Sequence, residues 1–151
     1  MYSIEEKKQL HTNFWGGFNL YCSRMSFLRG RKKKWMLHQT KVNNVHLKFD
    51  PGRDGVQVIL EILHRSEDQR LAVYEQIESC KSIMEEGFTQ GLIWDFAFVR
   101  DNGQEVCRIY TFKEGLDIYR QSQWEEMYQF MAENMYRLEQ NFLEIRDLII
   151  R

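Results

Sequence analysis

Alternating apolar and polar positions predict a β-hairpin over residues 45–64. In 45–50 every second side chain is apolar, which is typical of a strand with one buried face. The run 56–63 is apolar at nearly every position and rich in β-branched residues, which indicates an interior strand. The loop between them holds the only proline of the chain together with Gly52 and Gly55, at which we expect positive φ angles.

Apolar residues that recur every three or four positions predict three helices. They begin at Ser3, Ser66 and Ser122, and each serine is followed three residues later by Glu or Gln, the spacing of a capping box. The first is expected to reach Leu28 and the second to end at Gly87. Within the first, the neighbouring glycines at positions 16 and 17 predict close packing against another backbone.

The third helix carries a stripe near period 3.5, formed by Trp124, Met127, Met131, Met135, Leu138, Phe142, Ile145 and Ile149. A helix of this span would be roughly 40 Å long, which exceeds the diameter of a small domain. One end is therefore expected to project or to meet a partner.

A second hairpin is predicted from 92–100 and 105–112, which flank an Asn-Gly pair at Asn102 and Gly103, the strongest short hairpin signal. The segment 35–40 predicts one further strand or extended stretch. The order of elements is then α-β-β-β-α-β-β-α. We expect a single α+β domain over 1–151, with an antiparallel sheet of about five strands built from two hairpins and flanked by three helices.

The composition is ordinary for a soluble globular protein, with 43% hydrophobic and 28% charged residues. No stretch approaches the roughly 20 apolar residues of a membrane span, and the N-terminus lacks a signal-peptide pattern. Cys22, Cys80 and Cys107 are scattered and lack metal-ligand spacing, so we expect small buried hydrophobes and a cytoplasmic location.

The net charge of −1 hides a basic segment. Eight of the 21 basic residues and none of the 22 acids lie in 24–48. Cations there could contact phosphates, and Trp35 could stack on an unpaired base. The predicted nucleic-acid-binding residues are Arg29, Arg31, Lys32, Lys33, Lys34, Trp35, Lys41, His46 and Lys48. The alternative is a solvated loop that keeps the domain soluble, with Trp35 in the core.

The second strand of the central hairpin matches the residue pattern of a metal-dependent nuclease only in part. Asp54 precedes that strand and Glu61 lies on it, but position 63 is leucine where the nuclease pattern needs lysine. Asp54 is equally explained as a turn residue and Glu61 as an ion-pair partner, and His64 is expected on the opposite face from Glu61. We therefore predict no catalytic residues, no metal and no cofactor, unless Glu61, His64, Asp95 and Arg108 converge.

Protein association is the alternative function. Met127, Met131 and Met135 suit an adaptable surface, and apolar residues in 142–149 would need cover if that end extends beyond the sheet. A two-fold homodimer or a partner protein would supply it.

Several motifs together resemble a known family: NFWGGFNLY, KKW followed by VHLKFD, EQIESCKSIME, LIWD and SQWEEMYQFMAENMYRLEQ. They are similar, over nearly the whole chain, to the uncharacterised bacterial family catalogued as domain of unknown function number 4268. Members occur alone or C-terminal to other domains, some of them restriction-endonuclease-like nucleases. The resemblance implies an accessory or recognition module near nucleic acid, and it brings no established catalytic residues.

The sequence thus predicts a non-catalytic binding or accessory module with nucleic acid as the leading ligand. Homodimerisation or protein binding through the last helix is the alternative, and a degenerate restriction-type nuclease is less favoured.

Overall fold

The computed structural model describes residues 2–25 and 40–149. Its helices are α1 (Ile4–Arg24), α2 (Glu67–Glu78), α3 (Lys81–Met84) and α4 (Trp124–Ile149), with a short 3₁₀ turn, η3 (Gln121–Gln123), before α4. Its strands are β1 (Val45–Pro51), β2 (Gly55–Ile62), β3 (Ile93–Val99) and β4 (Glu105–Glu114). They form one antiparallel sheet in the order β1-β2-β4-β3.

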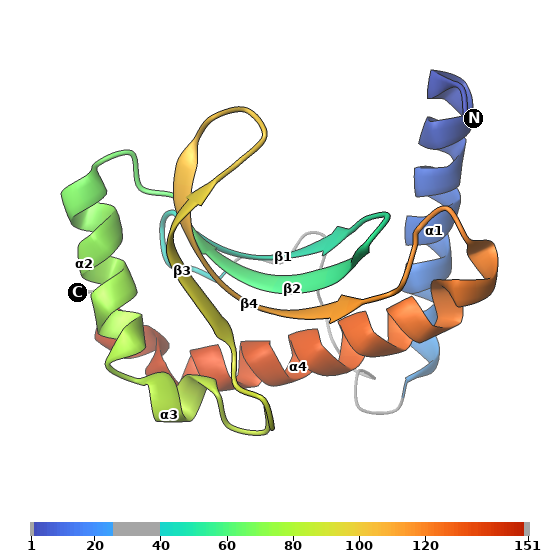
Figure 1. Cartoon of the computed structure of the whole chain (residues 1–151). Helices are drawn as coiled ribbons and strands as arrows, with labels where there is room; N and C mark the ends of the chain where they lie inside the picture. Colours follow the sequence, from blue (N-terminus) through green and yellow to red (C-terminus); the bar gives the residue numbers. More distant parts are fainter. Residues whose placement is uncertain (1, 26–39, 150–151) are drawn as a thin grey trace.

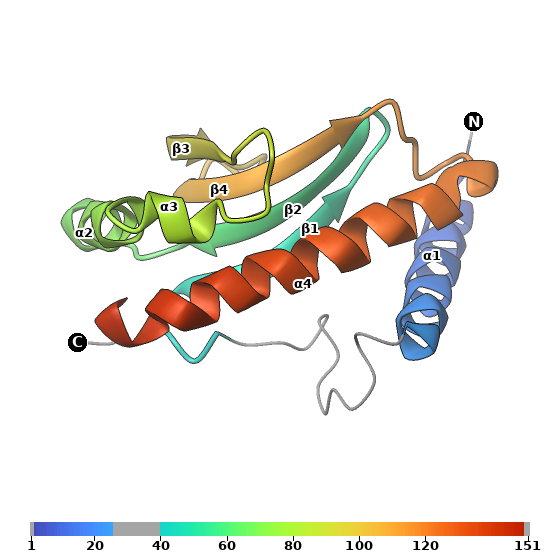
Figure 2. The ribbon, with the colours of Figure 1, turned by 90° about the horizontal axis from the view of Figure 1, so that it is seen from below.

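The described helices lie on one face of the sheet and at its two ends. Helix α4 runs along the convex face, α2 and α3 lie at one end, and α1 stands at the other (Figures 1 and 2). None of the described helices covers the concave face (Figure 1). The predicted α+β class and both hairpins are confirmed, while the described sheet has four strands. Residues 35–39 of the additional predicted strand lie outside the described residues.

The second predicted helix is in fact two helices. The Ser79 hydroxyl donates to the Gln76 carbonyl at 2.6 Å, and the amide of Cys80 bonds the carbonyl of Ile77 three residues back. These bonds tighten the last turn of α2 and end it. The prediction of one continuous helix to Gly87 is therefore wrong.

Two turn glycines were assigned the wrong role. Gly52 and Gly55 do not have positive φ, whereas Gly103 of the second hairpin does, at 86°. Position 55 has no room for a side chain, because a Cβ there would lie 2.6 Å from the ring of Phe112 and would also clash with the carbonyl of Lys113. This glycine lets β2 and β4 approach closely at the start of their pairing.

The methionine-rich stripe of α4 belongs to the core. All eight of its residues are buried, and they pack with Phe14 and Phe18 of α1 and with the inner side chains of β1 and β2. Phe142, Ile145 and Ile149 are therefore covered within the chain itself, while Leu148 is 58% exposed. The apolar end that motivated a dimer thus needs no second copy to bury those three side chains.

The two glycines of α1 differ in their surroundings. Gly17 lies against Tyr128 of α4, whose hydroxyl donates to the Phe14 carbonyl at 2.7 Å, and a Cβ on Gly17 would collide with that hydroxyl. Among the described residues, none has an atom within 4 Å of the Cβ position of Gly16. Close packing is therefore found at Gly17 only, and against a side chain rather than a backbone.

None of the helices in 2–25 and 40–149 has the length and apolar character needed to cross a membrane.

Candidate functional site

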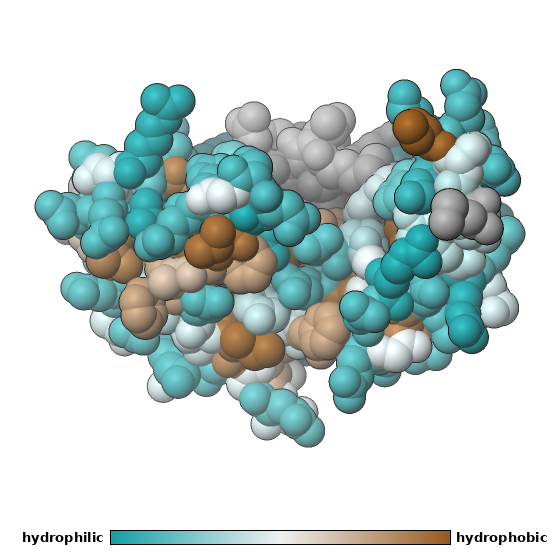
Figure 3. Space-filling model, turned by 45° about the horizontal axis from the view of Figure 1, so that its top comes forward, coloured by the Kyte–Doolittle hydropathy of each residue, from teal (hydrophilic) through white to brown (hydrophobic). Residues whose placement is uncertain are grey.

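The concave face of the sheet is lined by every second residue of each strand. The strand register places three rows of side chains on it: His46, Glu61, Arg108 and Asp95; Lys48, Ile59, Tyr110 and Ile93; and Asp50, Gln57 and Phe112. We call these rows the open face. The intervening residues, such as Leu60 and Ile109, enter the core beneath. Apolar surface lies beside polar surface over this side of the molecule (Figure 3).

Glu61 is a buried carboxylate in the middle of the open face. Its side chain is completely removed from solvent, and three cations surround it. Arg108 Nε donates to Oε2 at 2.7 Å, Lys48 Nζ lies 3.4 Å from Oε1, and Arg100 Nη2 also binds Oε1. A buried charge is costly unless it is paired and hydrogen-bonded, so this network is what allows an ionised acid in a mostly apolar strand.

The three cations determine the protonation state of Glu61. Burial acts to raise the pKa of this carboxyl, but hydrogen bonds from Arg100 and Arg108, with the nearby charge of Lys48, outweigh burial and hold the pKa below its ordinary value. Glu61 is therefore ionised at neutral pH, which disfavours a role as a proton donor.

Arg108 is held rigidly beside Glu61. Its Nη1 donates to Oε1 of Gln57 at 3.1 Å, and its guanidinium carbon lies 3.9 Å from the centre of the Phe98 ring. Only 5% of the residue is exposed. Hydrogen bonds on one edge and an aromatic ring on one face fix the orientation of the planar guanidinium. Its N–H groups are therefore oriented before a ligand binds.

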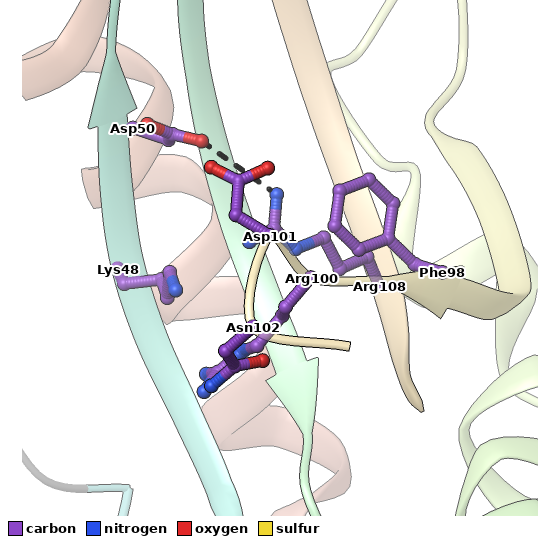
Figure 4. A pocket seen from close by; sticks show the side chains of 7 residues that line it. All are labelled: Lys48, Asp50, Phe98, Arg100, Asp101, Asn102 and Arg108. Atoms are coloured by element: carbon purple, nitrogen blue, oxygen red, sulfur yellow. Dashed lines mark ion pairs between the residues drawn. The ribbon is translucent and has the colours of Figure 1, made fainter. Parts of the chain in front are cut away.

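A pocket of about 330 Å³ lies over this cluster. It is lined by the seven residues labelled in Figure 4, which come from β1, from β3 and its following turn, and from β4: Lys48, Asp50, Phe98, Arg100, Asp101, Asn102 and Arg108. Asp50 lies 3.7 Å from Nη1 of Arg108. Donors and acceptors are thus interleaved around one aromatic ring.

Two aromatic side chains extend the site along β4. Tyr110 and Phe112 are two residues apart and so share the open face, and Phe112 is 41% exposed. β4 lies between β2 and β3. Tyr110 is paired on both sides, with Ile59 and Ile93, whereas Phe112 is paired with Gln57 and lies beyond the paired part of β3. Such rings offer flat faces to planar ligands.

The predicted nucleic-acid-binding residues are only partly described. Arg29, Arg31, Lys32, Lys33, Lys34 and Trp35 lie outside the described residues. His46 and Lys48 share the open face, as their spacing predicts. Lys41 lies apart from them, in the turn before β1, with a φ of 65°.

The acidic and basic residues of the enzymatic alternative converge only in part. Glu61, Arg108 and Asp95 are cross-strand neighbours in one row. Asp54 lies in the first hairpin turn, where its carbonyl accepts from the amide of Gly115 at 3.0 Å. His64 follows β2 and lies against Arg70, whose Nη1 donates to its carbonyl at 3.0 Å, and burial with the charge of Arg70 lowers the His64 pKa. Within 2–25 and 40–149, no cluster of three or more His, Cys, Asp or Glu side chains is arranged to hold a metal.

Several members of the site were not assigned to it from the sequence: Asp50, Gln57, Phe98, Arg100, Asp101, Asn102, Tyr110 and Phe112. The alternation within 92–100 and 105–112 places Tyr110 and Phe112 on the same face as Arg108, so the sequence pattern alone could have predicted this shared face. The approach of Arg100 to Glu61 spans 39 residues and depends on strand order, which the local pattern does not contain.

Comparison with known proteins identifies one family. The model of a family described as "Domain of unknown function (DUF4268)" matches residues 10–146. No curated protein and no solved structure matches the chain.

Proposed function

The chain belongs to this family of unknown function, and we propose that it binds single-stranded nucleic acid on the open face of its sheet. The observation that carries the proposal is the pair Tyr110 and Phe112, side by side on an interior strand and on the face that no described helix covers. An open antiparallel sheet with aromatic rings on an interior strand is a general solution for stacking unpaired bases.

Stacking favours a single strand over a duplex. Every base has a flat face, and each base stacked on a protein ring contributes about 1–3 kcal/mol. In a duplex these faces are covered by neighbouring base pairs. A flexible strand can spread its bases over a concave surface, whereas a duplex would present only its backbone to these rings.

Cations next to the rings support the same ligand. Lys48 is 34% exposed on the open face and Arg100 is 25% exposed at its border. The segment that precedes β1 in the sequence adds Arg29, Arg31 and Lys32–Lys34. Lys48 and Arg100 are already paired with Glu61, so most phosphate contacts would come from this preceding segment and would supply sequence-independent affinity beside the stacking.

A pair of phenylalanine variants tests the proposal. Phe112→Ala removes an open-face ring that is 41% exposed, whereas Phe96→Ala removes a more exposed ring of the same sheet, 58% exposed, whose neighbour is Tyr74 of α2. Fluorescence anisotropy with labelled oligo-dT and oligo-U should show roughly tenfold weaker binding for Phe112→Ala, because one stacked base is lost, and wild-type binding for Phe96→Ala.

Thermal unfolding of both variants separates lost binding from lost folding. Equal affinity of Phe112→Ala, Phe96→Ala and the wild type, with both variants folded, would contradict binding on the open face.

A further inference from the structure

Among the described residues, the positive and negative charges around the pocket over Glu61 balance, although the pocket is crowded with ionised groups. Lys48, Arg100 and Arg108 contribute three positive charges. Glu61 beneath them, with Asp50 and Asp101 at the rim, contributes three negative charges. A pocket without net charge has little electrostatic preference for a phosphate. Ligand binding in it would depend instead on directional hydrogen bonds.

A donor and an acceptor lie next to each other at the mouth of this pocket. The guanidinium of Arg108 offers N–H groups, and Asp50, whose side chain is 54% exposed, offers carboxylate oxygens 3.7 Å away. Asp50 and Asp101 both point toward the end of Arg108 (Figure 4). Glu61, Gln57 and Phe98 hold Arg108 in place, so the donor edge is set before a ligand arrives.

This order of groups matches one nucleobase better than the others. The Watson–Crick edge of guanine presents an acceptor, O6, followed by two adjacent donors, N1–H and N2–H. Arginine donates well to guanine O6, and a carboxylate can accept from two neighbouring N–H groups at once. In the same order along this edge, uracil and thymine present one donor between two acceptors. Cytosine and adenine present a donor at the position where guanine has O6.

We propose that this pocket binds an unpaired guanine, with Arg108 donating to O6 and Asp50 accepting from N1–H and N2–H. The assignment rests on the proposed binding of single strands and adds a base preference to it. Phe98 keeps the guanidinium plane of Arg108 oriented, and Tyr110 and Phe112 would hold the neighbouring bases without regard to their identity.

Oligonucleotides that differ at one base test this assignment. Oligo-dT carrying a single central dG should bind the full chain about tenfold more tightly than the same strand with dA, dC or dT at that place. Replacing the dG by deoxyinosine, which lacks the N2 amino group, should remove most of the difference. Equal affinities for the dG, inosine and dT strands would overturn the proposal.

Aspartate variants locate the preference in the pocket. Asp50→Asn should abolish the preference for dG, so that strands with dG, dA, dC or dT at the central position bind the variant with equal affinity. Asp54→Asn, an exposed aspartate in the turn of the same hairpin, should keep the preference. A preference for dG that survives Asp50→Asn would also overturn the assignment. Failure of every strand to bind would instead contradict the proposed function itself.

Discussion

Glu61 of β2 and Arg108 of β4 are direct partners in the antiparallel register, and Arg108 Nε donates to Glu61 Oε2 at 2.7 Å. Both residues are at least 95% buried on the sheet face opposite α4. Arg100 from the end of the second hairpin and Lys48 from β1 reach the same carboxylate. One acid therefore joins β1, β2 and the β3–β4 hairpin, and it fixes the geometry of the open face.

We predict that Glu61→Gln destabilises the protein by about 3 kcal/mol, because removing one member of a buried ion pair leaves the other charges uncompensated. Urea denaturation at pH 7 measures this free energy of unfolding. Glu114→Gln, at an exposed position of β4, is the control and should change it by less than about 0.5 kcal/mol. Similar stabilities for the two variants would contradict a central role for Glu61.

The same carboxylate predicts an acid-dependent loss of stability. The Glu61 pKa is held below its ordinary value in the folded protein, so below that ordinary value the unfolded chain binds a proton more readily than the folded one. Acidification then favours unfolding. The contribution of Glu61 is fully present above its unfolded-state pKa and is lost as the pH falls through the folded-state pKa.

Urea denaturation between pH 7 and pH 3 checks this dependence. The free energy of unfolding should fall more steeply for the wild type than for Glu61→Gln, since the variant has no carboxyl to titrate at this site. Parallel curves for the two proteins would show that Glu61 does not carry the effect.

Two neighbouring glycines of α1 should respond to alanine in opposite directions. Gly17→Ala places a methyl group against the Tyr128 hydroxyl and should cost about 2 kcal/mol by overpacking. Gly16→Ala adds a methyl group where no described residue lies within 4 Å, and should stabilise the helix by up to about 1 kcal/mol. The melting temperature of each variant, compared with that of the wild type, shows whether the variant is stabilised or destabilised.

Tyr128→Phe identifies the contact responsible. Alone it should cost about 1 kcal/mol, because the hydrogen bond to the Phe14 carbonyl is lost. Combined with Gly17→Ala it should cost less than the sum of the two changes, because the clashing hydroxyl is gone. If the destabilisation of the double variant equalled the sum of the two single changes, the strain of Gly17→Ala would come from a contact other than the Tyr128 hydroxyl.

Local signals predicted much of the fold. The Ser3 capping box is present with both of its hydrogen bonds, Ser66 caps α2, and Gly103 takes the positive φ that an Asn-Gly turn requires. The long apolar stripe of α4 was correctly located, but its role in the core rather than at a partner surface depends on which elements cover it. Local periodicity cannot reveal that.

The candidate site was harder to predict because it depends on strand order. Alternation shows that Lys48 and Glu61 lie on strands, but it does not show that β4 rather than β3 pairs with β2. That pairing brings Arg108 to Glu61 across 47 residues. The role of Gly55 was missed for the same reason, since the group that needs the space belongs to β4.

The basic residues and the open face make separable contributions to binding. Changing Arg31, Lys32, Lys33 and Lys34 to Gln should weaken binding and reduce its dependence on salt, because fewer counterions are released. The control changes the exposed residues Lys7, Lys8, Arg65 and Arg120 to Gln and alters net charge equally. If the control lowers affinity and salt dependence as much, the effect belongs to net charge alone.

The most direct test of nucleic-acid binding is a titration of the wild-type chain with labelled single- and double-stranded oligonucleotides at 50 mM and 200 mM salt. We predict that single strands bind more tightly than the duplex at both concentrations. Their affinity should fall by one to two orders of magnitude at the higher salt, as expected for roughly five phosphate contacts. Absence of binding above background at 50 mM salt, or a preference for the duplex, would contradict single-strand binding on the open face.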